Sequence, residues 1–444
     1  MYVRSAMKLI TNSEALILKQ YVVQFLEQHY LQGPLDWVID EECKGIVFFE
    51  REGQSITFDD TLLHDLDKNW LNPNFVPIPL RNGIAHPSSA AIVDDWATIF
   101  YLLSQYSECM QEEKDMHQRI SALHSLVVEK RWHERCLVNE CAERILTLIQ
   151  SNIPEFHWHL PKKTYRISHN VERPFKYQSE RWKIHVKRAL GSYRFGNSLN
   201  RVIKELMRLA LYPFLKDNID PFNHIQWMIQ ENVNFKSKPV FYFCSVTQHL
   251  EFDPQYHLTD KKIRGIVDLV LSRNGRMGCL SNYDSSQTMQ GITANWKALH
   301  DQLLVKTGSN LNRQHFQRFH PFNFAEQLML AGVDEDSSIG FTDRTGWRTS
   351  CSLPYYLFDI KNKKISTVLE IPFCAMDQAI ITPRYMNIAS PEKVMVEMVK
   401  RLKDVERYGG VYCVVWHNDT FQYPFYRNTY WKLMKKAAQL GECQ

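Results

Sequence analysis

After residue 160 the sequence alternates short apolar stretches with stretches of helical periodicity, and this alternation constrains the fold more than any other feature. Repeated strand–helix units are typical of a parallel sheet that helices cover on its faces. Roughly seven strands in about 280 residues predict a closed or nearly closed βα barrel. The predicted strands are 165–168, 239–244, 276–281, 335–339, 368–372 and 410–416, and the predicted helices are 223–232, 260–273, 295–307, 322–331, 391–407 and 426–440.

The chain before residue 160 mixes helix and strand signals without this alternation. Apolar residues fall on one helical face over 13–30, and 45–50 and 54–58 have strand character. Helices are predicted at 94–107 and near 137–149. Prolines at 154 and 161 then interrupt the pattern. We therefore predict an N-terminal α/β domain over residues 1–160 and a barrel over residues 161–444.

The segment that joins the two predicted domains is aromatic. Residues 154–161 contain Phe156, Trp158 and Leu160 and neither Gly nor Ser, whereas a flexible linker is rich in both. The rings have to be buried, most simply between the domains. The two domains are therefore predicted to share a substantial interface.

Composition excludes several classes of protein. Lys and Arg number 53 against 49 Asp and Glu, and this net charge of +4 has no concentrated basic stripe, so no nucleic-acid partner is predicted. No apolar run reaches the roughly 18–20 residues that a membrane span requires, and the first 25 residues lack a signal-peptide pattern. Ten scattered cysteines without a CxxC pair predict a reduced, cytoplasmic protein with no zinc–thiolate site.

Polar residues follow several of the predicted strands. His169, Asn170 and Glu172 come after the first strand, Tyr283 and Asp284 after the strand 276–281, and His417 directly after the strand 410–416. Loops at the carboxyl ends of parallel strands converge at one end of a barrel, so these residues are predicted to share one cleft. The alternative for each of these residues is that it caps a helix or closes a loop.

The order of several segments adds a family resemblance. Residues 165–440 resemble the polysaccharide deacetylase (NodB-homology) family, most closely a bacterial branch that carries an additional uncharacterised N-terminal domain. The segments are YRISHNVERP, DPFNHIQWMIQENVNFKSKPVFYF, DPQYHLTDKKIRGIVDLV, GCLSNYDSS, RQHFQRF, DSSIGFTDRTGWRTSCSLPYYLFD, LEIPFCAMD and YGGVYCVVWHNDTF, and residues 94–130 resemble the first domain of that branch. The resemblance implies a distorted (β/α)7 barrel.

The same resemblance implies metal-dependent removal of acetyl groups from N-acetylated sugars. In this chemistry one carboxylate is the general base, and a second carboxylate with histidines holds a divalent metal that activates water. A histidine after the last strand is the acid, which corresponds to His417. Arg313 belongs to the matching RQHF segment and is included with Asn170 and His417 among the candidate catalytic residues.

This sequence departs from the family pattern at the positions that carry the chemistry. The pattern His-Asp-Val-Asp is His169-Asn170-Val171-Glu172 here, so the base is replaced by an amide that cannot accept a proton at neutral pH. The metal histidine falls on Leu280, or on Ser281 in another register. Glu172 is left as a doubtful metal ligand. We predict either no cofactor or a weakly bound divalent metal.

Four further residues are candidate substrate contacts. Tyr283 and Asp284 belong to the GCLSNYDSS segment, His315 either lines the cleft or is a satisfied structural histidine, and Trp347 either stacks on a sugar or belongs to the core. Two segments imitate functional motifs. Residues 57–60 spell TFDD, but a strand end before a helix is favoured, and 157–159 (HWH) lacks a third ligand.

Three classes of function remain open. The first is a pseudoenzyme of bacterial surface-glycan metabolism that binds a carbohydrate or glycan precursor, or a protein partner, in the old cleft. The second is an active deacetylase with a remodelled site. The third is an interaction protein built on a barrel scaffold. Loss of both the base and the metal histidine favours the first.

Overall fold

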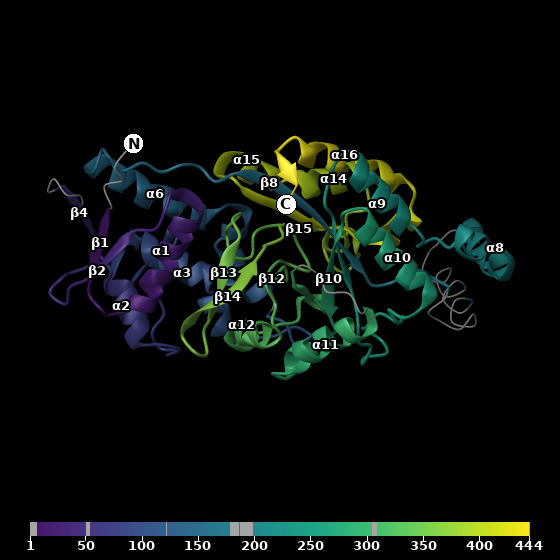
Figure 1. The fold of residues 1–444 in the computed structure, drawn as a ribbon, viewed down its shortest axis with the longest axis horizontal. Helices are drawn as coiled ribbons and strands as arrows, with labels where there is room; N and C mark the ends of the chain where they lie inside the picture. Colours follow the sequence, from purple (N-terminus) through teal and green to yellow (C-terminus); the bar gives the residue numbers. More distant parts are fainter. Residues whose placement is uncertain are drawn as a thin grey trace.

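The computed structural model describes residues 7–49, 54–120, 122–177, 186, 199–303 and 309–443. Its two regions lie side by side, the N-terminal region at the left of Figure 1 and the larger sheet-containing region at the centre and right. Within the described residues, no helix has both the length and the apolar character needed to cross a bilayer.

The N-terminal region is built on a small four-stranded sheet with helices beside it. The sheet has the order β2-β1-β3-β4, and a second sheet of order β5-β6-β7 lies further along the chain. The predicted helix over 13–30 and the predicted strands at 45–50 and 54–58 are all present. The elements are β1 Lys8–Thr11, α1 Leu16–Tyr30, β2 Asp36–Ile39, β3 Ile46–Phe49, β4 Ser55–Phe58, α2 Thr61–Lys68, β5 Ile78–Leu80, β6 Gly83–His86, β7 Ser89–Asp94, α3 Asp95–Leu103, α4 Tyr106–Cys109, α5 Leu126–Glu129 and α6 Leu137–Asn152.

The second region is a curled, mostly parallel sheet. The strands follow the order β13-β14-β12-β11-β10-β9-β8-β16-β15, with β17 also paired to β8, and β13 is the antiparallel member. The strands are β8 Lys163–Val171, β9 Val240–Phe243, β10 Arg276–Ser281, β11 Leu311–Gln314, β12 Glu335–Asp336, β13 Tyr355–Asp359, β14 Lys364–Glu370, β15 Ala375–Met376, β16 Gly410–Val415 and β17 Glu442–Cys443.

Helices alternate with these strands, as the sequence predicts. They are α8 Leu199–Leu215, α9 Ile225–Asn234, α10 Lys261–Ser272, α11 Gly291–Leu303, α12 Pro321–Leu330, α13 Asp377–Ile381, α14 Pro391–Val399, α15 Leu402–Tyr408 and α16 Phe425–Ala438. Local chemistry fixes several of their first turns. Ser390 accepts a hydrogen bond from the Lys393 amide and precedes Pro391, a favourable start for α14.

Three expectations about the sheet need correction. Closure of a barrel is not confirmed, because β13 and β15 stand at opposite ends of the paired order in the described residues. The first strand does not end at Ser168, since pairing with β9 continues through Val171 and places His169 and Asn170 inside β8. The strand β11 was not predicted at all, because its sequence LNRQ carries three polar side chains.

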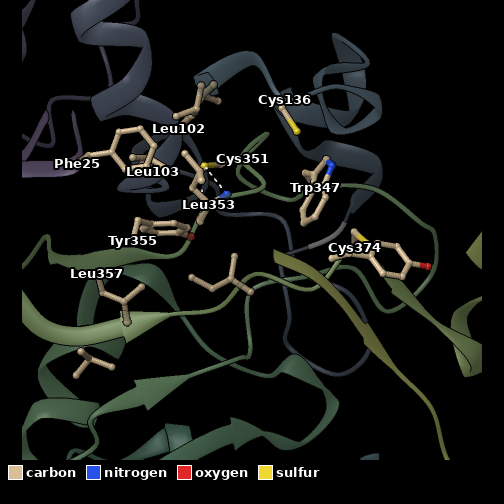
Figure 2. Close-up of a cluster of buried hydrophobic side chains, with 14 of the residues drawn as sticks. Phe25, Leu102, Leu103, Cys136, Trp347, Cys351, Leu353, Tyr355, Leu357 and Cys374 are labelled. Atoms are coloured by element: carbon tan, nitrogen blue, oxygen red, sulfur yellow. Dashed lines mark hydrogen bonds between the residues drawn. The ribbon is translucent and has the colours of Figure 1, made fainter. Parts of the chain in front are cut away.

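The two regions share a hydrophobic core. The Phe358 ring of β13 lies 5.2 Å from the ring of Tyr21 on α1 and 5.1 Å from that of Phe100 on α3. The Tyr21 hydroxyl also donates a 2.7 Å hydrogen bond to the carbonyl of Tyr356. Figure 2 shows Phe25, Leu102 and Leu103 of the N-terminal helices facing Tyr355 and other residues of the second region. The predicted interface is therefore present.

The aromatic linker contributes less to that interface than predicted. Phe156 is buried, but Trp158 packs 6.2 Å from Tyr30 of α1 and donates to Gln150 of α6, both in the N-terminal region. Leu160 is largely exposed. The helices α1 and α3 contribute more to this hydrophobic contact between the regions than the linker rings do.

Candidate functional site

Alternation along β8 sorts its polar residues into two environments. Ser168 and Asn170 lie on the side of the sheet that faces Arg313, because successive side chains of a strand point to opposite faces. His169 points the other way. Its Nδ1 lies 3.0 Å from the carbonyl oxygen of Trp416, and its Nε2 lies 3.2 Å from the Tyr430 hydroxyl. Burial lowers the pKa of His169 to about 3, so this histidine is a neutral structural residue.

Arg313 of β11 is buried and has neutral hydrogen-bond partners. Its Nη1 donates to the Asn170 Oδ1 at 3.0 Å, and its Nη2 donates to the hydroxyls of Ser168 at 3.0 Å and Ser337 at 2.8 Å. Its Nε donates to the Ser337 carbonyl at 2.8 Å, and its guanidinium lies 4.2 Å from the Tyr242 ring centre. The guanidinium therefore fixes the amide of Asn170, whose oxygen is already used as an acceptor.

His417 follows β16 and is oriented by a carboxylate that the sequence reasoning did not select. Its Nδ1 lies 2.6 Å from Asp377 Oδ1, and its backbone N–H donates to Asp377 Oδ2 at 2.9 Å. The Thr420 hydroxyl donates to the same carboxylate. Burial by itself would lower the pKa of His417, but the charges of Asp377 and Glu172 outweigh it and hold this pKa well above its usual value.

Glu172 lies between two imidazoles. Its Oε1 is 3.3 Å from the Nε2 of His417 and 3.4 Å from the Nε2 of His315. The Nδ1 of His315 is 3.6 Å from Asp253 Oδ1, which also accepts a 2.7 Å hydrogen bond from the Tyr283 amide. The five groups thus form an alternating row of carboxylates and imidazoles, Asp253–His315–Glu172–His417–Asp377, which we call the acid–imidazole row.

Protonation of the acid–imidazole row follows from its geometry. Burial would raise the pKa of Glu172, but the neighbouring charges of His417 and His315 hold it well below its usual value. Burial would also lower the pKa of His315, but Glu172 and Asp253 raise it to about 9. At neutral pH the row therefore holds ionised Glu172 between two imidazolium groups.

The residues present do not fit the metal that the family resemblance implies. In the described part of the chain, no group of three or more His, Cys, Asp or Glu side chains is arranged to hold a metal ion. Leu280 is buried in an apolar cluster with Val240 and Tyr242, and the Ser281 hydroxyl is occupied by Asn312. A metal at Glu172 would have to displace a proton from each imidazole and would gain no ligand from position 280.

A cavity of about 220 Å³ opens onto one side of the acid–imidazole row. Asn170, Glu172 and His417 line it together with Arg119, Phe316 and Tyr385, among others. A second cavity of about 410 Å³ shares Arg119, Thr342 and Tyr385 with it, so the two adjoin. The larger cavity carries four arginines and two aspartates, Arg119, Arg344, Arg348, Arg384, Asp115 and Asp343.

The N-terminal region supplies part of this site. Arg119 donates from Nη1 to the carbonyl of Phe316 at 3.1 Å, and Arg318 donates from Nε to the carbonyl of His117 at 2.8 Å. The turn between His315 and Arg318 contains Phe316 and Gln317, whose φ angles are 59° and 49°. This left-handed conformation is costly for residues other than Gly. Contacts from the segment around Arg119 therefore hold the turn that carries His315.

None of the four predicted substrate contacts lines the small cavity, and three of them have side-chain partners outside the acid–imidazole row. Trp347 is fully buried and donates from Nε1 to Asp404 at 3.0 Å. It therefore belongs to the core, which was one of the two roles expected for it. Asp284 pairs with Arg318 at 2.6 Å, and the Tyr283 hydroxyl lies 3.0 Å from Nδ1 of His117. Asp284 does not line the small cavity with His417, because Arg318 holds its carboxylate elsewhere.

The structure also places the remaining motifs. His315, left open between a cleft and a structural role, lies in the acid–imidazole row, whereas the TFDD residue Asp60 precedes α2 and pairs with Lys19. Sequence reasoning missed two carboxylates of the acid–imidazole row. Asp377 directly follows the apolar segment IPFCAM, just as His417 directly follows an apolar strand, so the same pattern could have identified it. Asp253 lies in a polar loop, where this pattern is absent.

One family model and one solved structure match parts of this chain. A protein-family model described as "Family of unknown function (DUF7033)" matches residues 8–154. No curated protein matches the chain. Among solved structures, the chain is similar to one titled "Crystal structure of Puue Allantoinase", with a TM-score of 0.38 and 9% sequence identity over 62% of this chain and 84% of that one.

Proposed function

We propose that this protein is a polysaccharide deacetylase-like carbohydrate-binding protein in which an acid–imidazole row replaces the metal centre of hydrolysis. The observation that carries the proposal is convergence. Asn170, Glu172, Arg313, His315 and His417 come from three separate segments of the family resemblance. Asn170, Glu172 and His417 line one cavity, and Arg313 and His315 contact Asn170 and Glu172 from behind it. On this interpretation the curled sheet and its helices are an open form of the distorted (β/α)7 barrel.

The position of the expected general base argues against metal-dependent hydrolysis. Asn170 cannot accept a proton at neutral pH, and its oxygen is held by Arg313 at 3.0 Å. A water molecule near it would lack the base that deprotonates an attacking nucleophile. On this proposal, Asn170 keeps the size of the expected aspartate but cannot act as a base.

The small cavity retains what a sugar needs for binding. His417 and Arg119 offer charged donors, Glu172 offers an acceptor, and the Phe316 ring offers an apolar face. Sugars present hydroxyl and amide groups that pair with such side chains and C–H faces that pack on rings. N-acetylated oligosaccharides are therefore the proposed ligands.

The test is a binding titration of N-acetylglucosamine oligosaccharides by calorimetry, with acetate release followed in the same samples. We expect binding without acetate release, and about tenfold or greater weakening in a His417→Ala protein that loses a charged donor. Asp284→Asn is the matched control, because this residue lies outside the small cavity, and it is expected to bind as the wild type does. Metal-stimulated acetate release that disappears in Glu172→Ala would contradict the proposal.

A second candidate function is metal-independent hydrolysis by His417. The favouring observation is the 2.6 Å contact between His417 Nδ1 and Asp377, which orients the imidazole as in an acid–base dyad. Acetate release that persists in a chelator and falls at least a hundredfold in Asp377→Asn would support it. No release from wild-type protein under these conditions would exclude it for the substrate tested.

A further inference from the structure

Helix α8 carries an exposed apolar face. Its exposed large apolar residues repeat at intervals of three or four, so they lie along one side of the helix. Phe214 is the most exposed at 82%, and Met207 is 58% exposed. The complete set is Leu199, Ile203, Met207, Leu211, Phe214 and Leu215. A contiguous apolar face of this size on the surface marks a contact with something else.

The opposite side of α8 packs against Lys176 and Tyr177, which follow Glu172 in the sequence. Val202 is buried, and the Tyr212 ring lies 5.1 Å from the ring of Tyr177. Glu205 Oε1 accepts a 2.9 Å hydrogen bond from the Tyr177 hydroxyl and also pairs with Lys176. In Figure 1 the helix projects from the right-hand end of the molecule, away from the sheet. The apolar face therefore points outward from a helix that is anchored on its inner side.

The charge of α8 identifies the kind of surface that it fits. Its sequence carries Arg201, Lys204 and Arg208 against a single acid, Glu205. Lys204 and Arg208 are exposed and follow the edge of the apolar face. Glu205 pairs with Lys176 and lies 4.0 Å from Arg208, so the helix and Lys176 together keep a net positive charge. An amphipathic helix with leucine, methionine and phenylalanine on one side and basic residues beside them is typical of a helix that lies in a membrane interface.

We propose that α8 docks this protein onto the surface of a bilayer that contains anionic lipid. The apolar face enters the boundary between headgroups and acyl chains, and the basic flank meets the negative headgroups. Lys176 and Tyr177, which contact α8 through Glu205, follow the carboxyl end of β8, where Asn170 and Glu172 lie. Docking therefore brings a peripheral protein, without any spanning helix in its described part, to the membrane by the same end as its cleft.

The experiment is co-sedimentation of the full-length protein with vesicles of phosphatidylcholine alone or with about 30% phosphatidylglycerol. We expect binding to the anionic vesicles that weakens as salt increases. Phe214→Asp with Met207→Asp should lower the partition constant about tenfold or more, because two large apolar side chains no longer enter the interface. Lys204→Glu with Arg208→Glu should remove the preference for anionic vesicles.

The matched control is Ile92→Asp. Ile92 is 75% exposed on β7 in the N-terminal region, and its replacement should leave vesicle binding unchanged. Absence of wild-type binding at low salt, or equal binding by all variants, would overturn the proposal.

Two further outcomes would overturn it in favour of another occupant. A dimer in sedimentation velocity without vesicles, converted to monomer by Phe214→Asp, would assign the apolar face to a second copy of the chain. A lower melting temperature in Phe214→Asp, with no vesicle binding by wild type, would assign it to a segment such as 178–198, whose sequence contains Trp182, Leu190 and Phe195.

Discussion

Two neighbouring parts of the cleft carry buried charge in different ways. On one side, the Arg313 guanidinium is surrounded by an amide, two hydroxyls, a carbonyl and an aromatic ring. On the other side, Glu172 lies within 3.4 Å of two imidazoles, each of which has a further carboxylate on its far side. The first arrangement has no partner that titrates near neutral pH, whereas every member of the second is titratable.

The comparison explains what the substitution at position 170 changes. On the proposed function position 170 replaces an aspartate, and the Asn170 oxygen accepts the hydrogen bond from Arg313 without the charge or the basicity of a carboxylate. The Arg313 side therefore has a structural role. The capacity to exchange protons lies with Glu172, His315 and His417, and this is the side where any remaining chemistry is expected.

The largest expected effect comes from removing the guanidinium. Arg313→Met leaves Asn170, Ser168 and Ser337 without their buried donors, and each unsatisfied buried group costs about 1–3 kcal/mol. We expect a loss of about 3–5 kcal/mol in the free energy of unfolding, measured with urea. Arg131→Met is the control, since Arg131 is largely exposed and pairs only with Glu134 at the surface, and a change above about 0.5 kcal/mol there would undermine the comparison.

The second effect is pH dependence on the Glu172 side. The pKa of His315 is about 9 in the folded protein and about 6.5 unfolded, so the folded state binds the extra proton. This contribution is fully present below pH 6.5 and is lost as the pH rises through 9, by up to about 3 kcal/mol. Urea titrations between pH 6 and 9 measure this slope.

Glu172→Gln separates this contribution from other titrating groups. The variant removes the central negative charge, so the pKa values of His315 and His417 should both fall and the slope between pH 6.5 and 9 should become shallower. Its unfolding free energy at pH 6.5 should be about 2–3 kcal/mol below that of wild type. An unchanged slope would show that the acid–imidazole row does not store these protons.

Restoring the family residues gives a smaller and more specific effect. Leu280 pairs with Arg313 in register across β10 and β11, so its side chain faces the interior where Asn170 also lies. Asn170→Asp with Leu280→His should raise zinc affinity about tenfold or more over wild type, because it adds an imidazole and a carboxylate. Zinc retained after dialysis is the readout, and no gain would mean that position 280 does not align with the metal histidine.

The smallest effect concerns the larger, arginine-lined cavity. Arg384 is exposed there, and Arg119, Arg344 and Arg348 lie close to carboxylates. Arg384→Glu should weaken binding of acidic oligosaccharides about two- to fivefold and leave neutral ones unchanged, since a single exposed charge contributes less than about 1 kcal/mol. Equal effects on both kinds of sugar, measured by calorimetry, would show that this cavity does not distinguish charge.

The sequence predicted the central apolar strands β9 and β16 and missed the polar strand β11, together with β13 and the short strands β15 and β17. Residues 410–416 and 239–244 are buried on both sides, and their composition marks them as central strands. The strand β11 is equally buried, but Asn312, Arg313 and Gln314 reach that state through side-chain hydrogen bonds. Hydropathy depends only on the local sequence, so it does not reveal hydrogen-bond partners on other strands.

The site residues that were predicted also differ from those that were missed in whether a local sequence pattern marks them. His417 and Glu172 were selected because each follows an apolar strand, a local property of the sequence. The role of His315 was left open, and Asp253 and Asp377 were not selected, because what makes them functional is proximity across the fold. Segment order within the family resemblance supplied the only link between Arg313 and Asn170.

The most direct test is the protonation of the two imidazoles in metal-free and zinc-treated protein, read from their ¹⁵N chemical shifts at pH 7.5. If protons occupy the place of a metal, His315 and His417 should both give imidazolium shifts, and equimolar zinc should leave them unchanged. Glu172→Gln should move both towards neutral imidazole. Neutral imidazoles in the wild type that shift on stoichiometric zinc binding would contradict this account.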